Sequence, residues 1–387
     1  MKRQITIKEI AEMAKVNPST VSRVLNGDKK YSITNEVRSR ILELADRYSY
    51  APQGTARSLA CRQTFNIAII LDRVENDMAS SAGALLLGSI CREITKQNYK
   101  AILLPASGKD IDAEVLHCIR SSNADAYFIG GLMAGNKTWN ELEKSKTPAA
   151  TFLGDTITGE NMPNIDVVTL DVESGYRELF RELSDRHFRS TALFFLEEHK
   201  QVTKRYPAAL LAKEYGLEIS EDIPFKCPVV DFKIRHSARK TALAAMDRLR
   251  HQEVILCSND LAAMGVCDAL EECGIRPGVD ISVVGFDNLE IQSTYRAPED
   301  DQELPELATI DTHLAKAGNL IVNLLLKRIR ENRIEKETLS VKSTFIPRRT
   351  LGFPKTSASS GISRKSSHAK NEKSMIQEPH IRKESLS

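Results

Sequence analysis

From Phe65 onward, short apolar runs bounded by turn residues alternate with stretches whose apolar residues recur at helical spacing. This alternation is typical of parallel sheets covered by helices on both faces, because strands buried on both sides are almost continuously apolar. The predicted strands span 65–71, 101–105, 126–130, 149–153, 167–170, 190–195, 254–257 and 281–285. The predicted helices span 82–97, 111–120, 174–185, 204–215, 237–250, 260–273 and 313–330.

The length of this alternating region predicts two lobes rather than one. About 290 residues exceed what a single layered unit with one core ordinarily holds. We therefore expect an α/β core of two doubly wound parallel-sheet lobes, with one crossover near residues 162–164. Such folds bind ligands at the carboxyl ends of their strands, so the expected site for a small molecule is a cleft between the lobes. Trp139 lies in a polar stretch and is expected at the surface.

The first 48 residues contain three short helical patterns, each with its own start signal. Thr6 and Glu9 have the spacing of a capping box, in which each side chain accepts from the other residue's backbone N–H. Asn17 followed by Pro18 starts the second helix, and Thr34 caps the third. Two short helices that are joined by a tight turn and packed on a third form a helix-turn-helix unit. The expected inner stripe of the third helix is Val37, Ile41, Leu44, Ala45 and Tyr48.

Charge is distributed unevenly along the chain, although the net charge is only +2. Residues 1–62 contain 12 Lys or Arg and 6 Asp or Glu, whereas residues 63–350 carry a net charge of −8. A basic head on an acidic body favours a polyanionic partner for the head, and a solvated basic surface is the alternative. Residues 351–387 are rich in Ser and Lys and poor in apolar residues, so we expect a disordered basic tail.

Composition and motifs exclude several classes of protein. A hydrophobic fraction of 41% and a charged fraction of 27% are those of a soluble globular chain. No apolar run approaches the length of a membrane span, and the N-terminus lacks the apolar stretch of a secretory signal. The seven cysteines form no C-x-x-C pair, which favours reduced thiols in a cytoplasm. P-loop, G-x-S-x-G and H-E-x-x-H motifs do not occur, so we expect no enzyme activity, metal site or cofactor.

Two widely separated blocks carry a family resemblance. Residues 16–27, Val-Asn-Pro-Ser-Thr-Val-Ser-Arg-Val-Leu-Asn-Gly, resemble the N-terminal signature of the lactose-repressor (LacI/GalR) family of bacterial transcription regulators. Residues 257–260 and 277–288 resemble two core motifs of the same family. The resemblance implies a DNA-binding head at 1–49, a hinge at 50–62 and a periplasmic-binding-protein-like effector core at 63–350. It also implies a homodimer.

The resemblance places the DNA contacts of the head on the second helix, whose first turns would enter a major groove. Arg23 can bind guanine through two hydrogen bonds, and Ser19 can donate or accept at several bases. Short polar residues near helix starts suit phosphate contacts, although Thr20 and Ser22 have the alternative of being ordinary surface residues. The expected DNA-contacting residues of the head are Thr6, Asn17, Pro18, Ser19, Thr20, Ser22, Arg23, Asn26, Ser32 and Thr34.

The hinge is the second DNA contact that the resemblance implies. Leu59 matches a leucine that wedges into a base step of the minor groove, where an apolar wedge kinks the duplex. Ala56 would pack against the same residue of the other subunit. The alternative is that Leu59 packs on the core. Gly54 costs helix stability, so we expect a hinge that is less ordered without DNA than is typical of the family.

The effector residues implied by the resemblance follow strands of the core. Asp287 comes at the end of a buried strand, where a carboxylate can bind sugar hydroxyls. Asn259 follows another strand, and its alternative role is to cap the helix 260–273. Asp171 matches a polar position between the lobes, and Lys204 and Arg205 occupy the region of the family's effector arginine.

The sequence therefore predicts a cytoplasmic, nucleoid-associated transcription regulator, most often a repressor. As a homodimer it would bind a near-palindromic operator in double-stranded DNA, with no membrane partner. Its small-molecule effector would be a sugar or sugar derivative, and a purine-like corepressor is the alternative. Two rival classes are a solute-binding protein that does not bind DNA and a sugar-modifying enzyme. The basic head and the missing export signal argue against the first, and the lack of a catalytic constellation argues against the second.

Overall fold

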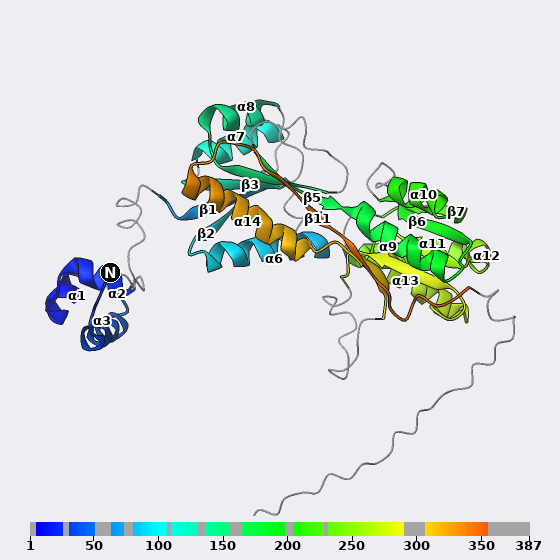
Figure 1. Ribbon diagram of the computed structural model, residues 1–387, viewed down its shortest axis with the longest axis horizontal. Helices are drawn as coiled ribbons and strands as arrows, with labels where there is room; N and C mark the ends of the chain where they lie inside the picture. The colour runs from blue at the N-terminus through cyan, green and yellow to red at the C-terminus, as the bar shows by residue number, and fades with distance from the viewer. Residues whose placement is uncertain are drawn as a thin grey trace, which may run out of the picture.

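The computed structural model shows a small helical head and an α/β core of two lobes (Figure 1). It describes residues 5–25, 31–50, 63–72, 80–106, 110–121, 123–130, 136–154, 165–197, 204–227, 231–289 and 306–354. The predictions for Asn26, for the hinge residues Ala56 and Leu59, and for residues 355–387 lie outside these ranges.

The head consists of α1 (Ile7–Ala14), α2 (Pro18–Leu25) and α3 (Asn35–Arg47). Its core forms where the three helices meet, and Ile10, Val21 and Ile41 are completely buried there. Tyr48 was expected in this core but is exposed, because α3 ends before it, and Tyr50 packs against the core instead.

The first lobe is built on a parallel six-stranded sheet in the order β11-β5-β4-β3-β1-β2. Its strands are β1 (Asn66–Asp72), β2 (Lys100–Ala106), β3 (Ala126–Gly130), β4 (Ala149–Leu153), β5 (Asp166–Asp171) and β11 (Thr338–Lys342). One face packs on α6 (Ser81–Lys96) and α14 (Leu314–Glu331), and the other packs on α7 (Ile111–Ser121) and α8 (Asn136–Ser145) (Figure 1). Strand alternation divides β1 between these faces, since Ile67 and Ile69 join the first cluster and Ala68 and Ile70 the second.

The second lobe repeats this strand order, as β12-β10-β9-β8-β6-β7. Its strands are β6 (Ser190–Leu196), β7 (Glu218–Phe225), β8 (Val254–Cys257), β9 (Ser282–Phe286), β10 (Ala308–Asp311) and β12 (Thr344–Ile346). β12 pairs antiparallel to β10. Helices α9 (Val172–Asp185) and α10 (Arg205–Glu214) cover one face, while α11 (Asp231–Ala244) and α13 (Asp260–Glu272) cover the other. The short α12 (Met246–Leu249) follows α11.

Between residues 165 and 354 the chain passes from one lobe to the other three times, after β5, after β10 and after β11. The prediction of a crossover near residues 162–164 is wrong, because β5 follows that segment and still belongs to the first sheet. The three crossings pack together at Gly175. Its N–H donates to Ser343 Oγ at 3.0 Å, and a methyl group on its Cα would lie 2.5 Å from Ile310 Cγ2.

The predicted fold class is confirmed, and every predicted strand is present with small shifts at its ends. Sequence periodicity missed β7, β10, β11, β12 and α8, which are short or rich in polar residues. Trp139 was expected at the surface but is buried, because α8 turns it into the first lobe. Helix 237–250 instead begins at Asp231 and is interrupted at Ala245. The chain also stays packed beyond residue 350, since Leu351 is buried in the second lobe.

Candidate DNA interface and ligand site

Helix α2 turns its polar residues away from the head core. Val21 and Val24 are buried against the other two helices, and Ser19 lies exposed on the outer side of the helix. Asn17 is also exposed, and its carbonyl accepts the first helical hydrogen bonds from the N–H groups of Thr20 at 2.9 Å and Val21 at 3.3 Å. The other predicted contact residues of this helix, Pro18, Thr20, Ser22 and Arg23, are half-buried. The first turns of α2 thus form a polar surface that is accessible to a large partner.

Arg23 is held by an aromatic side chain that the sequence did not single out. Its guanidinium carbon lies 3.7 Å from the ring centroid of Tyr31, a cation–π contact. Tyr31 is itself 49% exposed, so the pair lies at the surface of the head. The contact limits the directions in which the guanidinium can point.

Two of the polar residues predicted near the other helix starts, Thr6 and Thr34, act as caps. Thr6 Oγ1 accepts from the Glu9 N–H at 3.3 Å, and the Glu9 carboxylate accepts from the Thr6 N–H at 2.7 Å, so the predicted capping box is confirmed. Thr34 Oγ1 accepts from the Val37 N–H at 3.4 Å. Thr6, Thr34 and also Ser32 are exposed.

The predicted ligand residues Lys204 and Asp287 meet at the carboxyl edge of the second sheet. Lys204 Nζ lies 3.2 Å from both carboxylate oxygens of Asp287 and 3.1 Å from the carbonyl oxygen of Ser258. An ammonium group has three N–H donors, so these contacts use its whole capacity. The same nitrogen lies 4.1 Å from the ring centroid of Phe286. The two side chains are 20% and 13% exposed, so the ion pair is largely shielded from water.

The loop that carries Asp287 is fixed from several directions. Asp287 and Asn288 have φ angles of 95° and 53°, in the left-handed region that non-glycine residues rarely adopt. The Asp287 N–H donates to the Ile310 carbonyl at 2.8 Å, and the Asn288 amide donates to Asp311 at 2.9 Å. Below the loop, the fully buried Asp260 accepts from Leu289 N–H at 2.5 Å. These bonds offset the backbone strain and hold the Asp287 carboxylate in one place.

The remaining predicted ligand residues are placed differently. Asn259 lies next to Ser258 at the same edge, but its side-chain oxygen accepts from the Ala262 N–H at 2.8 Å and thus caps α13. Asp171 ends β5 in the first lobe, and it caps α9 by accepting from the Ser174 N–H at 3.0 Å. Arg205 begins α10, and its side chain lies outside the part of the structure that is described. The structure therefore brings Lys204, Asn259 and Asp287 to one edge and leaves Asp171 at the first crossing.

Two family models match the chain. Residues 6–53, which include the head, match the model described as bacterial regulatory proteins, lacI family. Residues 180–351, which include most of the second lobe and the return to the first, match the periplasmic binding protein-like domain. The chain belongs to the lacI family of bacterial regulatory proteins. The resemblance that the sequence motifs indicated is thereby confirmed.

Individual lacI-family proteins resemble the chain over nearly its whole length. The HTH-type transcriptional repressor PurR of Erwinia tasmaniensis is 26% identical over 362 residues, which cover 89% of this chain and 96% of that protein. The ribose operon repressor of Haemophilus influenzae is 24% identical over 363 residues, covering 89% and 98%. The solved structure of the Lac repressor bound to ONPG in the repressed state has the same fold. It aligns with a TM-score of 0.64 and 18% identity over 90% of this chain and 100% of that one.

As a lacI-family protein, the chain is a DNA-binding transcriptional regulator. The relatives that it matches are regulators and not enzymes, which agrees with the prediction from the sequence. Within the residues that the structure describes, no helix is long and apolar enough to cross a membrane.

Proposed function

We propose that this regulator is a homodimeric repressor that binds a near-palindromic operator with α2 of each head in a major groove. The accessible polar surface of α2, with Arg23 stacked on Tyr31, is the observation that carries this proposal. A helix that enters the groove with its N-terminal end places these side chains at base edges. Two heads related by a two-fold axis require two half-sites with matching symmetry.

In this proposal the contact residues have different roles. Ser19 and Arg23 contact bases, and Pro18, Thr20 and Ser22 lie beside them in the groove. Short polar groups at the helix starts hold phosphates, which sets the position of the head without reading sequence. These phosphate-binding residues are Thr6, Asn17, Asn26, Ser32 and Thr34. The hinge at 50–62 adds a minor-groove contact, in which Leu59 wedges a base step and Ala56 packs against the partner's hinge.

The effector site of the proposal lies between the lobes, at Lys204 and Asp287. A ligand that separates this ion pair must accept from the ammonium and donate to the carboxylate at the same time. Neighbouring hydroxyl groups on a sugar do both, which favours a sugar or sugar derivative. The likeness to a ribose operon repressor supports the same class of effector. Asn259, Arg205 and Asp171 are the further candidate contacts on this side of the core.

The chain itself connects the proposed effector site with the first lobe, which follows the hinge and the head in the sequence. The Asp287 N–H donates to Ile310 in β10, and β10 continues through residues 312–313 into α14 of the first lobe. A ligand that shifts the Asp287 loop would therefore change the relative energies of two lobe arrangements. Because the hinge and head precede β1 of the first lobe, that change would alter how the two heads meet DNA.

The test is a selection of binding sites from random duplexes with the full chain at fixed salt. We expect enrichment of a two-fold symmetric site, and a screen of sugars for thermal stabilisation should then identify compounds that change its affinity. Failure to prefer any duplex over random competitor, with and without the screened sugars, would contradict the proposed operator binding.

A further inference from the structure

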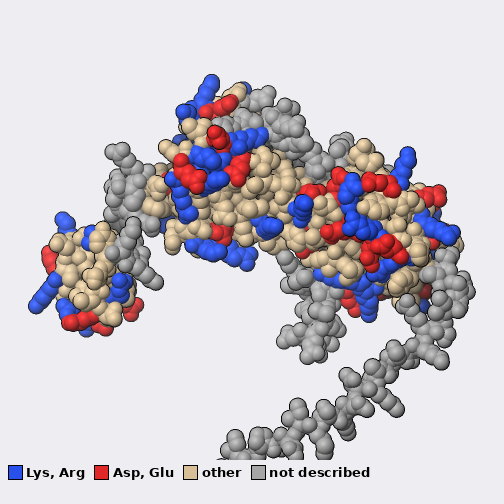
Figure 2. All heavy atoms as spheres, in the orientation of Figure 1, with Lys and Arg blue, Asp and Glu red and all other residues tan. Residues whose placement is uncertain are grey.

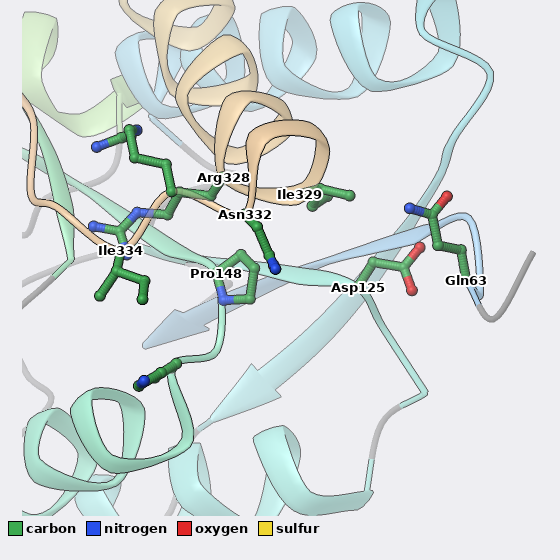
Figure 3. Close-up of a pocket in the computed structure, with 9 residues that line it drawn as sticks. Gln63, Asp125, Pro148, Arg328, Ile329, Asn332 and Ile334 are labelled. Carbon is green, nitrogen blue, oxygen red and sulfur yellow. The ribbon is translucent and has the colours of Figure 1, made fainter.

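A pocket of about 380 Å³ lies in the first lobe (Figure 3), whereas the proposed effector residues Lys204 and Asp287 lie in the second lobe. Its lining includes Gln63, Asp125 and Pro148, which come shortly before β1, β3 and β4. The pocket thus opens at the amino ends of the strands, whereas ligands of this fold class bind at the carboxyl ends. The end of α14 closes it from the other side with Arg328, Ile329 and Asn332 (Figure 3).

The polar groups around the pocket carry more positive than negative charge. Arg328 and Arg333 line it, and both donate to the single carboxylate of Asp166, at 2.8 Å and 2.6 Å. Beside them, Glu337 accepts from Lys327 at 2.8 Å. This cluster therefore has three cations and two carboxylates, which leaves one positive charge in excess. The Arg328 side chain is only 3% exposed, so water screens the cluster weakly.

Two further lining residues add to this balance. Lys146 contributes another cation, and Asp125 contributes a carboxylate. That carboxylate is already engaged, because it accepts from the N–H groups of Thr64 at 2.7 Å and Phe65 at 2.8 Å. Lys146 is exposed and can move toward an occupant.

Hydrogen-bond donors are also available at the pocket. Arg333 Nε is buried and has no acceptor among the described residues, which is costly for a charged guanidinium group. The Asn332 amide extends from the end of α14 toward Pro148 (Figure 3). Pro148, Ile329 and Ile334 supply an apolar wall. This combination suits a molecule with an anionic head and a small apolar body better than a bare inorganic ion.

We propose that this pocket is a second ligand site, which binds a small organic anion carrying a phosphate or carboxylate group. Lys146, Asn332 and Arg333 bind the anionic oxygens, and Pro148, Ile329 and Ile334 contact the organic part. Gln63, the first described residue after the hinge segment, lines the same pocket. An occupant therefore touches the chain where it leaves the hinge. The binding itself does not depend on the function proposed above.

The proposal is tested by calorimetric titration of the full chain with phenyl phosphate, benzoate and the neutral benzyl alcohol. We expect saturable binding of at least one of the two anions and none of the alcohol, and comparison of the two identifies the preferred head group. Lys146→Ala and Asn332→Gly should each weaken binding at least about fivefold, since each removes a donor. Glycine suits position 332, where φ is 54°, so that variant should keep the fold.

Lys144→Ala is the matched control, because Lys144 belongs to the same helix end and does not line the pocket. The affinity of this control variant for the preferred anion should equal that of the original protein. Equal binding of the alcohol, or unchanged affinity in both pocket variants, would overturn the proposal. The proposal would also be overturned if neither small anion bound while Lys146→Ala weakened the binding of a random DNA duplex. In that case the pocket residues would contact the DNA backbone.

Discussion

The head and the second lobe hold their candidate contact residues in opposite states. At the start of α2, Asn17 and Ser19 are exposed, and the Arg23 guanidinium stacks on the exposed ring of Tyr31. In the second lobe, Lys204 and Asp287 bind each other, and Asn259 is engaged with the start of α13. Figure 2 shows basic and acidic side chains on the head as well as on the second lobe, so the two regions differ in how their contact residues are engaged.

This difference follows from the size of the partner that each region is proposed to bind. DNA is large and highly charged, so a protein surface that meets it needs accessible donors and gains affinity from many weak contacts. A small ligand makes few contacts, and its site must remain stable when it is empty. An internal ion pair meets that need, but any ligand must then replace hydrogen bonds that the protein already has.

The largest effect is expected for Arg23→Ala in the head. Loss of a two-bond base contact costs about 1–3 kcal/mol in each half-site, so specific affinity should fall by about 2–6 kcal/mol in a dimer. The free energy of unfolding should fall by no more than about 1 kcal/mol, the usual size of the exposed cation–π contact with Tyr31 that the variant loses. Fluorescence anisotropy with the selected operator and a scrambled duplex measures both affinities. If the variant still discriminated equally well between the two duplexes, Arg23 would not contact the bases of the operator.

Lys204→Met should have the opposite effect to Arg23→Ala. The free energy of unfolding should change, whereas the operator affinity of the ligand-free protein should stay the same. The substitution leaves the shielded carboxylate of Asp287 without its cation, which should lower the free energy of unfolding by about 1–3 kcal/mol. Urea unfolding of the full chain measures this loss.

A double-mutant cycle with Asp287→Asn isolates the interaction between the two side chains. The double variant should recover part of the loss of the lysine variant, since no unpaired charge remains. Strictly additive losses would show that the two groups do not interact, and the contrast between the two regions would then disappear.

Tyr31→Ala should reduce specific affinity by about 0.5–1 kcal/mol in each half-site, the usual size of an exposed cation–π contact. Tyr31→Phe keeps the ring and is the matched control, with an expected change close to zero. Binding to scrambled duplex should remain the same in both variants, because the proposed role is to orient Arg23. A loss of similar size with Phe would instead indicate that the Tyr31 hydroxyl contacts DNA.

The smallest effect concerns the turn between α1 and α2. Lys15 has a φ of 55° and ends α1 in the left-handed conformation, which costs a residue with a Cβ about 1 kcal/mol. Lys15→Gly removes this strain but makes the unfolded chain more flexible, so the expected net gain is about 0.5 kcal/mol. Slower amide hydrogen exchange in α1 and α2 of the full chain would reveal this gain in stability. Faster exchange in these helices would show that the flexibility of glycine outweighs the strain.

Local sequence signals predicted the starts of the three head helices and most of the sheet strands correctly. The capping box at Thr6 and the buried runs such as 126–130 and 254–257 have the predicted bounds, because their cause lies within a few residues. The motif at 16–27 also led to the right family. Trp139 and β11 were missed, because a polar segment becomes buried or paired only when a distant part of the chain lies beside it.

By itself, the sequence determined most of the helices and strands, the presence of a helical head and an α/β core, and the residue types available for contact. Tertiary structure alone decided which sheet each strand joins, that Tyr31 lies under Arg23, and that Lys204 meets Asp287 across 83 residues of chain. The physical reason is the range of the forces involved. Helix caps and apolar periodicity act between near neighbours along the chain, whereas ion pairs, stacking and pockets depend on distances that exist only after the lobes have folded.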